Sequence, residues 1–500
     1  MATFTVGIDL GTTNSVACSL IDGQYRFIPM GSGNGTVLPS VFLYQNGQKT
    51  FGALANRKSV IYNENFISSA KTYLGNSEVK WEIDGQRFTP TDVATEILTY
   101  MHEQIVKELK AEQNDEIKAV ITVPAYFTAN QIDETKKAGE AAGFIVKRII
   151  TEPVAAAITY GSELAGDKTE RLFVFDLGGG TFDVSVLKVT GTGENREFNT
   201  EYVGGDSKLG GDDFNEVIYE LLLAHLRRTE GVNLASAEIA GMDEAKFANV
   251  RQKLMVKAEA VKCELSELNE SYVQISNLFD HNGTVISLEF TITRDEFQEA
   301  SQHLINRIKS EVEKTFTDSN LKKHDITKVI LVGGSSQLKF VNDYITDFFQ
   351  LQPYSNIDLS KIVAMGAANL AFNASSGIGN VMITDIISHS LGIRVIGGYF
   401  SPILAKNSKY PIKQTESYTT VRDYQDVINI EVFEGDAEYV DNCEYYGNFE
   451  LTNIEHTRAG IPEILVTFEF DENRILTVTA KDRKTKSEKS ITINKDKLSN

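Results

Sequence analysis

The first 375 residues alternate between short apolar runs and stretches in which apolar residues recur every three or four positions. Residues 118–127 (KAVITVPAYF) form an apolar run that predicts a buried strand. Residues 133–144 predict a helix that ends at a glycine, and 328–338 predict a strand, a glycine turn and the start of a helix. An amphipathic helix is predicted by apolar residues at every fourth position, Val93, Ile97, Met101, Ile105 and Leu109. This alternation predicts an α/β architecture.

The pattern changes after residues 371–380 (AFNASSGIGN), a small, Gly- and Ser-rich stretch typical of a linker. Beyond it, apolar and polar residues alternate with period two, which predicts antiparallel strands. The clearest examples are 426–435, 464–480 (two strands around a turn at 471–474) and 490–495. We therefore expect an α/β part at 1–375, a linker at 376–386, a β-sandwich at 387–496 and a short tail at 497–500.

Composition narrows the class of protein. A chain of 500 residues is too long for one hydrophobic core, so two to four domains are expected. A net charge of −20 argues against a nucleic-acid or anionic-membrane surface. The cysteines, Cys18, Cys263 and Cys443, are far apart and fit a reducing compartment. With neither a secretory signal nor a long apolar span in the sequence, a cytoplasmic location is expected.

Two segments repeat one unusual pattern, VGIDLGTTNS (6–15) and FVFDLGGGTFDVS (173–185). In each, an apolar run ends in an aspartate, Asp9 or Asp176, and Leu-Gly follows. Period-two apolar residues then resume, so each segment predicts a β-hairpin. The tips are rich in glycine, hydroxyl and amide groups: Gly11, Thr12, Thr13 and Asn14 in the first, Gly178, Gly179, Gly180 and Thr181 in the second.

These tips predict an anion site that also holds a cation. Glycine lets backbone N–H groups approach an anion, and threonine hydroxyls add donors. Asp9 and Asp176 would repel phosphate unless a hard cation lay between them, and Mg²⁺ held partly through water is the natural candidate. One such hairpin could be a plain turn, but two copies favour a clamp that encloses a triphosphate from both sides.

Other stretches fit the same cleft. Gly333 and Gly334 follow a predicted strand, where backbone can lie against a ribose or phosphate. Glu152 precedes Pro153 at a predicted helix start, and the alanines that follow indicate a helix packed closely against a neighbour. Residues 362–372 repeat that small-residue texture, so the two halves of the α/β part look duplicated.

The motifs GIDLGTTNS, VITVPAYF, RIITEPVAAAITYG, FDLGGGTFD, KLGGDDF and VILVGG together resemble the heat-shock protein 70 chaperones of the DnaK type. The resemblance runs in order through essentially the whole chain. It implies a two-lobed, actin-like ATPase domain, built as a duplicated ribonuclease-H-like fold, followed by an all-β sandwich that binds peptide. Actin-like proteins and sugar kinases share the first fold but lack these motifs and the β part.

The resemblance also implies roles for single residues. Asp9 and Asp176 would hold Mg²⁺ through water, with Thr12, Thr13 and Asn14 on the phosphates. Lys71 would be the catalytic lysine, Glu152 would orient the attacking water, and Thr181 and Asp183 would contact the γ-phosphate. Backbone contacts to the nucleotide would come from Gly11, Gly178, Gly179, Gly180, Gly210, Gly211, Gly333 and Gly334, and ribose and adenine contacts from Glu259, Lys262 and Ser266.

In the β part, the resemblance implies an apolar peptide cleft formed by Ile393, Ile396, Tyr418, Val421, Ile428 and Ile430. By pattern alone, these alternating residues fit ordinary sandwich core better than a peptide cleft. Pro124, Arg148 and the linker residue Asp385 would couple the cleft to the ATPase domain. Implied partners are unfolded client polypeptides, a J-domain co-chaperone and a nucleotide exchange factor, and the implied cofactors are ATP or ADP with Mg²⁺.

The chain departs from the family pattern at several positions. Cys263 and Gln337 stand where arginines commonly flank adenine, which predicts weaker stacking on the base. Ile132 replaces an arginine that works with the proline, and Thr384 replaces a linker leucine. Residues 497–500 stop where the family's helical lid would begin, so the chain is expected to be either a truncated piece, which the stop favours, or a specialist without a lid.

Three alternatives to an active chaperone remain open from sequence. The chain could be a degenerate homologue with weak nucleotide binding. It could be a small-molecule kinase of the same fold, with Asp183 or Glu152 as base. It could also be an actin-type filament protein. The last two leave residues 387–495 without a role.

Overall fold

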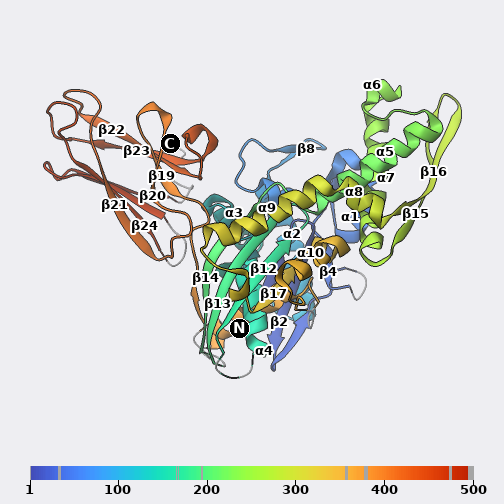
Figure 1. The fold of residues 1–500 in the computed structure, drawn as a ribbon, viewed down its shortest axis with the longest axis horizontal. Helices are drawn as coiled ribbons and strands as arrows, with labels where there is room; N and C mark the ends of the chain where they lie inside the picture. Colours follow the sequence, from blue (N-terminus) through green and yellow to red (C-terminus); the bar gives the residue numbers. More distant parts are fainter. Residues whose placement is uncertain are drawn as a thin grey trace.

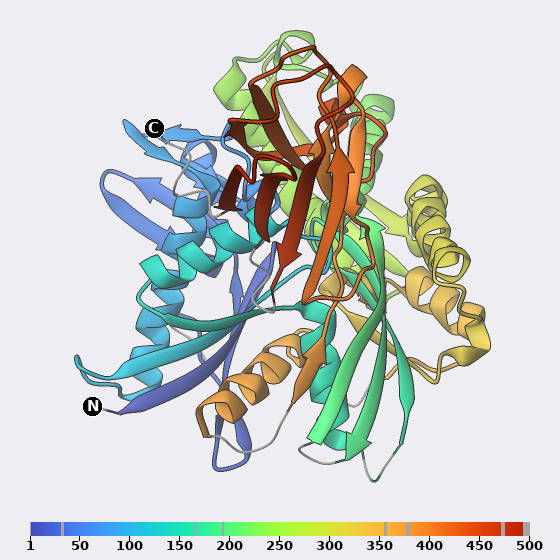
Figure 2. The same ribbon diagram turned by 90° about the vertical axis from the view of Figure 1, so that its left-hand side faces the viewer.

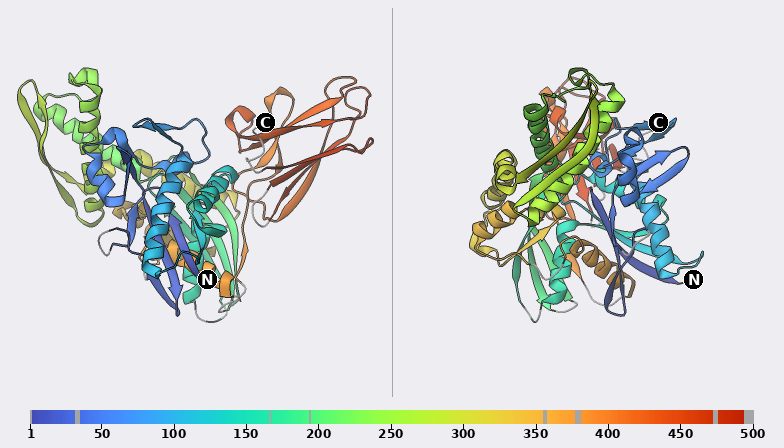
Figure 3. Two further views of the ribbon diagram at one scale, coloured as in Figure 1. Left: turned by 180° about the vertical axis from the view of Figure 1, so that it is seen from behind. Right: turned by 90° about the vertical axis from the view of Figure 1, so that its right-hand side faces the viewer.

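The computed structural model describes residues 2–31, 35–164, 166, 168–192, 195–354, 358–376, 381–471 and 476–493. An α/β body carries an all-β unit at one end, while α5 (Gly211–Glu230), α7 (Glu244–Glu267) and their neighbours lie at the other end (Figure 1). Figure 3 shows the same separation from behind. The predicted linker lies partly, at 377–380, outside the described residues, and so does the whole predicted tail at 497–500.

The first sheet contains the first predicted hairpin. Its strand order is β11-β10-β1-β2-β3, with β4 also paired to β2. β1 pairs antiparallel with β2 and parallel with β10, the strand predicted at 118–127, which ends before Pro124. The bounds are β1 (Thr3–Leu10), β2 (Asn14–Ile21), β3 (Gln24–Phe27), β4 (Val37–Pro39), β10 (Glu116–Val123) and β11 (Ile145–Thr151).

Two helices associated with this sheet follow the predicted pattern. On α2 (Pro90–Leu109), all the apolar positions predicted to face the core are buried. The next helix, α3 (Ala129–Ala141), begins four residues earlier than the pattern indicated, because Thr128 and Gln131 form a capping box there. Gly143, with φ of 97°, lies just beyond its end, as predicted for a glycine stop.

The second sheet repeats the arrangement of the first. Its order is β17-β12-β13-β14-β18. β12 pairs antiparallel with β13 and parallel with β17, so both sheets place a hairpin beside a parallel strand. The predicted strand–glycine–helix unit is confirmed as β17, Gly333 with φ of 80°, and helix α10. The bounds are β12 (Glu170–Leu177), β13 (Phe182–Thr192), β14 (Asn195–Asp206), β17 (Lys328–Val332) and α10 (Lys339–Phe349).

Two small-residue helices, α4 (Glu152–Glu163) and α11 (Ile362–Ser376), lie between the two sheets (Figure 2). They pack so closely that a Cβ added at Gly366 of α11 would overlap the backbone carbonyl of Ala155 in α4. Gly7 of β1 lies equally close to the α11 backbone. The close packing predicted from the alanine runs is therefore confirmed.

The remaining elements of the body surround these layers. Apart from single 3-10 turns, they are α1 (Gly52–Ser59), α6 (Ala237–Ala240), α8 (Arg294–Ala300), α9 (Gln302–Asp318), β5 (Phe42–Gln45), β6 (Gln48–Phe51), β7 (Phe66–Ile67), β8 (Trp81–Ile83), β9 (Gln86–Phe88), β15 (Glu270–His281) and β16 (Thr284–Thr293). No helix in the described part of the chain is long and apolar enough to cross a membrane.

The C-terminal unit consists of two 4-stranded sheets, β20-β19-β22-β23 and β21-β24-β25-β26, whose pairings are all antiparallel. Their facing sides share one apolar core. The period-two segments are confirmed as strands, although residues 472–475 of the predicted turn lie outside the described residues. The bounds are β19 (Leu391–Arg394), β20 (Phe400–Leu404), β21 (Ile412–Tyr418), β22 (Val427–Glu434), β23 (Glu444–Thr452), β24 (Ile464–Phe470), β25 (Leu476–Asp482) and β26 (Glu488–Ile493).

The segment between body and β unit is itself a strand. β18 (Met382–Thr384) pairs parallel with Glu197–Asn199 of β14 and forms the edge of the second sheet. Asp385, just after it, is buried, and its Oδ1 accepts a hydrogen bond from its neighbour's backbone N–H at 3.0 Å. The connection is therefore anchored to the body along its backbone.

Replacing Gly366 by alanine tests the contact between α4 and α11. In an open helical position this change would stabilise the helix by up to about 1 kcal/mol. Here we expect a loss of about 1–3 kcal/mol in the free energy of unfolding, because the added methyl group must displace the α4 backbone. Urea titration of the Gly366→Ala variant measures this loss, and Ala374→Gly at an exposed position of the same helix measures the propensity alone. A more stable Gly366→Ala variant would contradict the contact.

Candidate functional site

The tips of the two predicted hairpins meet across a cleft. A Cβ at Gly179 would overlap the hydroxyl of Thr13, and one at Gly180 would lie 2.6 Å from Cγ2 of Thr72. Only glycine lets the second tip come this close to the first. The cleft is lined by these predicted residues together: Asp9, Gly11, Thr12, Thr13, Asn14, Lys71, Pro124, Glu152, Asp176, Gly178, Gly179, Thr181, Gly333 and Gly334.

Other predicted residues lie beside this lining. The N–H of Gly211 donates to the carbonyl of Gly178 at 2.9 Å, and Lys262 Nζ donates to the carbonyl of Gly211 at 3.0 Å. Gly210 caps the start of α5 directly behind the Gly179 carbonyl. Glu259 and Ser266 lie on α7 with Lys262, and Asp183 pairs with Asp176 in the β12–β13 ladder. A backbone hydrogen bond thus joins the second tip to the start of α5, and the Lys262 side chain joins α7 to the same backbone.

Lys71 and Glu152 form a buried ion pair at the centre of the cleft. Lys71 Nζ lies 2.8 Å from Glu152 Oε1, and the two side chains are 5% and 12% exposed. Nζ also lies 5.4 Å from the ring centroid of Phe127. Lys71 sits in a short 3-10 turn, residues 70–73, and Glu152 is the first residue of α4, so each is held by a defined element.

Three further carboxylates are crowded around this pair. Burial, followed by the charge of Glu152, raises the pKa of Asp9 to about 7 and that of Asp183 to about 8. The same causes raise the pKa of Asp176 well above its usual value. Thr122 Oγ1 donates to Asp9 Oδ1 at 3.1 Å. Among the described residues, one oxygen of Asp176 and both of Asp183 are buried without a hydrogen-bond partner.

This donor set fits a hard cation bound together with an anion. Carboxylate oxygens without partners suit Mg²⁺, and the Thr13 hydroxyl, also buried without a partner, can donate to an anion. No three His, Cys, Asp or Glu side chains of the described residues form a ready-made metal site. A pair of carboxylates suits such an ion when water and ligand oxygens complete its shell.

Contacts across the cleft were not predicted from the sequence. Ser69, with φ of 52°, precedes the Lys71 turn, and its Oγ donates to Asp212 Oδ2 of α5 at 2.9 Å. Gln252 Nε2 donates to Ser59 Oγ at 3.0 Å, which joins α7 to α1. Serine in a loop carries no sequence pattern, and these partners are more than 100 positions apart, so the sequence offered no signal for them.

The predicted coupling residues occupy different places. Pro124 lines the cleft, and Arg148 lies half-buried in β11, paired with Val120 of β10. Ile132 stands where the resemblance implies an arginine. It packs, partly buried, against the core of the first lobe, the part of the body built around the first sheet. The segment directly after Pro124, residues 126–130, contacts the β unit.

The predicted peptide-binding residues divide into three groups. Ile393 and Ile430 are buried in the core of the β unit. Tyr418 and Ile428 are partly buried against that core, and the Tyr418 hydroxyl is 3.0 Å from Ser401 Oγ. Ile396 and Val421 are 75% and 58% exposed. These last two are the ones whose apolar side chains are free to meet a ligand in this arrangement.

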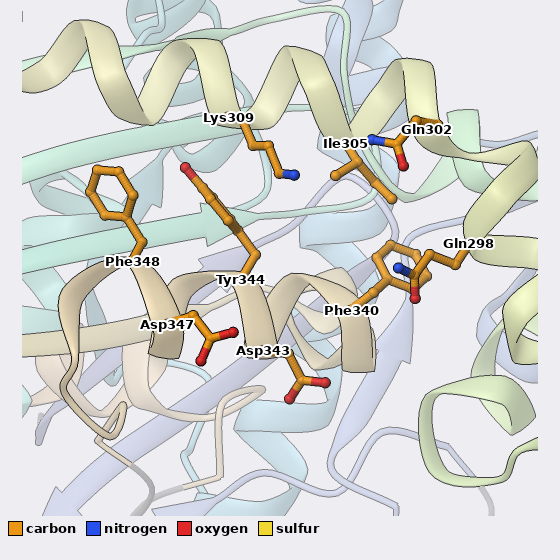
Figure 4. A pocket seen from close by; sticks show the side chains of 9 residues that line it. All are labelled: Gln298, Gln302, Ile305, Lys309, Phe340, Asp343, Tyr344, Asp347 and Phe348. Carbon is orange, nitrogen blue, oxygen red and sulfur yellow. The ribbon is translucent and has the colours of Figure 1, made fainter.

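A second hollow lies elsewhere on the body. It has a volume of about 450 Å³ between α8 and α9 on one side and α10 on the other (Figure 4). Ile305 and Phe340 lie at its base, and Lys309 lies 5.3 Å from the ring centroid of Tyr344. It shares no lining residue with the cleft between the hairpins.

Paired glycine- and threonine-rich tips over buried carboxylates, in an α/β body joined to a β unit, are the features of a protein that binds an anion together with a cation. A family model for Hsp70 protein matches residues 5–500. Because the match spans nearly the whole chain, the protein belongs to the Hsp70 family. Members of this family are ATPases that bind ATP or ADP with Mg²⁺ and work with client polypeptides and co-chaperones, so a chaperone role follows.

The buried pair can be tested without any assumption about function. Lys71→Met leaves Glu152 buried without its cation, so we expect a loss of about 3–5 kcal/mol in the free energy of unfolding. Lys71→Met/Glu152→Gln should recover part of it, because the charge of Glu152 raises the pKa of its three aspartate neighbours. Fluorescence of Trp81, the single tryptophan, follows unfolding in urea.

The matched control is Lys49→Met, which breaks an exposed Lys–Glu pair of 2.6 Å in the same lobe. It should cost less than about 1 kcal/mol. Equal losses for Lys49→Met and Lys71→Met would contradict the electrostatic account of the cleft.

Proposed function

We propose that this protein is an ATP-dependent chaperone in which ATP hydrolysis switches the affinity of the β unit for extended apolar peptides. The observation that carries this proposal is the meeting of the two hairpin tips around a buried pair and partnerless carboxylates. The matching hairpin-plus-parallel-strand arrangement of the two sheets supports an actin-like, duplicated fold for the body. We take residues 1–375 as this ATPase domain, 376–386 as its linker and 387–496 as the peptide-binding domain.

At the phosphate side of the cleft, Asp9 and Asp176 would hold Mg²⁺ through water. The ion would supply positive charge that neutralises the phosphates. Thr12, Thr13 and the Gly178–Gly180 backbone would donate to phosphate oxygens. Lys71 would stabilise charge that develops on the γ-phosphate, and Glu152, held by Lys71, would orient the attacking water. Thr181 and Asp183 would complete the γ-phosphate contacts.

At the proposed adenosine side, Lys262 lies beside the start of α5, where Nζ donates to the Gly211 carbonyl. Glu259 and Ser266 lie on the same helix as Lys262, α7. Gly333 and Gly334 follow the end of β17, beside the second tip, where a Cβ at Gly333 would overlap the β12 backbone. Cys263 and Gln337 take the places of stacking arginines. We expect nucleotide affinity below that of a site with guanidinium groups against the base.

Coupling between the sites follows from the second sheet. Strand β13 follows Thr181 and carries Asp183, β14 pairs with β13, and the linker strand β18 pairs with β14. A nucleotide that repositions the second tip therefore acts on the strand to which the linker is bonded. If ATP favours docking of the linker and lowers peptide affinity, peptide must oppose docking by the same free energy.

Hydrolysis gives the first functional test. Lys71→Met should reduce the turnover of ATP at least about 100-fold, because a preorganised charge in the transition state is lost. ATP affinity should change much less, since most phosphate contacts come from backbone and threonine groups. Single-turnover assays and titration with a fluorescent ATP analogue measure the two quantities, and Lys339→Met on the surface is the control.

Unchanged turnover in Lys71→Met would overturn the assignment of this site. Turnover near zero in the parent chain with intact ATP binding would instead indicate the degenerate homologue. ADP production that depends on an added sugar would indicate the kinase alternative.

Peptide binding gives the second test. Ile396→Asp places a charge at an exposed apolar position, so we expect about tenfold or greater loss of affinity for a fluorescent apolar peptide. Val285→Asp, at a position 56% exposed on β16 of the body, is the matched control and should have no effect. ATP, but not ADP, should speed peptide release. Equal affinities for the two variants would contradict a cleft at this end of the β unit.

A further inference from the structure

The β unit contacts the first lobe through a group of hydrogen bonds, beside limited apolar packing of Ala125, Tyr126 and Ala129. The chain from the end of β10 to the first turn of α3 supplies one side of these hydrogen bonds. The Asn130 N–H donates to the Tyr446 hydroxyl at 2.6 Å, the Ala129 N–H donates to Glu434 at 3.2 Å, and the Ser388 hydroxyl donates to the Phe127 carbonyl at 3.2 Å. His389 lies in the same contact, with its side chain 15% exposed.

Both ring nitrogens of His389 face hydrogen-bond acceptors. Nε2 lies 3.1 Å from the backbone carbonyl oxygen of Tyr126, in the first lobe. Nδ1 lies 3.3 Å from Asp436 Oδ2, in the β unit. The ring also packs edge-on against Tyr126, with centroids 4.2 Å apart. A carbonyl oxygen cannot donate, so this geometry calls for an N–H at each nitrogen unless Asp436 is protonated.

Asp436 stays ionised in this contact. Oδ1 of Asp436 accepts from the backbone N–H and from the hydroxyl of Ser390, both at 3.0 Å. Lys406 Nζ lies 3.8 Å from Asp436 Oδ2. Burial acts to raise the pKa of Asp436, but the hydrogen bonds from Ser390 and from His389 outweigh burial and lower this pKa to about 2. Neutral imidazole has one N–H and can satisfy only one of its two acceptors, whereas imidazolium satisfies both.

We propose that docking of the β unit on the first lobe takes up a proton at His389, which then bridges Asp436 and the Tyr126 carbonyl as an imidazolium. The Asp436 contact lies within the β unit and survives undocking, whereas the Tyr126 contact exists only when the two parts meet. A neutral ring that donates to Asp436 turns a lone pair towards the Tyr126 carbonyl. The docked state therefore needs the second proton and the undocked state does not.

The net effect of the surroundings of His389 also favours its protonated form. Burial lowers the pKa of His389, but the Asp436 hydrogen bond and the charges of Glu434 and Asp436 outweigh it, so the net pKa is raised. Burial raises the pKa of Glu434, next to Ala129, to about 7, with Tyr446 and Glu444 beside it. Lys406 Nζ, which donates to the Tyr126 hydroxyl at 2.8 Å, is the opposing cation. Asp183 acts at longer range, but with a pKa raised by burial to about 8 it is mostly protonated below that pH and adds little charge.

The sign of the pH dependence follows from these directions. His389 contributes to docking when it is protonated, so its contribution is complete below about pH 6.5 and is lost as the pH rises through the higher docked pKa. Glu434 adds a dependence of the same sign, because its burial favours the protonated form: this contribution is complete below its ordinary pKa of 4.5 and is lost as the pH rises through about 7. Acidification from about pH 8 to pH 6 should therefore favour docking, by up to about tenfold per pH unit for each proton taken up.

The proposal depends on the domain movement of the proposed function, but its main test does not need nucleotide. NMR titration of the histidine ring protons gives the pKa of His389, identified by the signal that disappears in His389→Gln. In the intact chain we expect a pKa above about 6.5. Ala129→Glu places a carboxylate against Glu434 and should open the contact, which should lower the pKa of His389. If the contact stayed closed, the added charge would raise it instead.

The second measurement is the protection of the β18 backbone amides against hydrogen exchange, corrected for intrinsic exchange rates. Protection should rise as the pH falls from about 8 to 6 in the intact chain, and the slope should decrease in His389→Gln. His456→Gln is the matched control, because His456 forms an exposed pair with Asp426, 2.8 Å apart, in the same unit.

An equal pKa of His389 in the intact chain and in Ala129→Glu overturns the proposal, as does an unchanged slope in His389→Gln. A proton-linked contact on which ATP has no effect would count against the proposed ATP switch and leave the proton linkage standing.

Discussion

The structure depends on the balance of charge at the point where the two hairpins meet. Four carboxyl groups surround one buried ammonium group, that of Lys71: Glu152, Asp176 and Asp183 are buried and Asp9 is half-buried. Ionised together without a further cation, they would repel one another in a site of low polarity. The raised pKa values of the aspartates express this repulsion. A Mg²⁺ ion bound there would relieve this repulsion, which supports the proposal that the cleft takes up a cation-bound anion.

One short segment connects this charge balance to the β unit. Pro124 lines the cleft, the ring of Phe127 lies beside Lys71 Nζ, and Tyr126 and Ala129 contact the β unit. These residues follow the parallel strand β10 at its carboxyl end, where the chain leaves the first sheet. A shift of Lys71 towards a ligand therefore acts on the same few residues that hold the β unit. Together with β18 at the edge of the second sheet, they place contacts to the β unit next to the cleft between the hairpins.

The sequence predicted the features that depend on local pattern. Buried positions on α2, the strand–glycine turns and the small-residue helices follow from periodicity and from glycine chemistry, and the structure confirms them. The hairpin tips were recognisable because each repeats an aspartate, glycines and hydroxyl residues. Lys71 was a different case, because a lone lysine in a loop carries no pattern and only the family resemblance singled it out.

What the sequence could not predict depends on contacts between distant residues. Two such contacts are the hydrogen bonds of Ser69 with Asp212 and of Gln252 with Ser59. These are ordinary polar residues, and only the folded arrangement shows that they pair. The position of the β unit is of this kind too. His389 lies just before a predicted strand, in a stretch with no distinctive sequence pattern. The carbonyl that it faces belongs to Tyr126, 263 positions earlier in the chain.

The use of several hydrogen bonds in this contact has a physical reason if docking must be reversible. An apolar interface would gain free energy with every square ångström buried and would favour one state strongly. Hydrogen bonds exchanged with water contribute only about 1 kcal/mol each, so two states can lie within a few kcal/mol of each other. Such a balance can be changed by a ligand in the cleft, and equally by one proton on His389. The residues that make docking easy to reverse are thus the same ones that make it sensitive to pH.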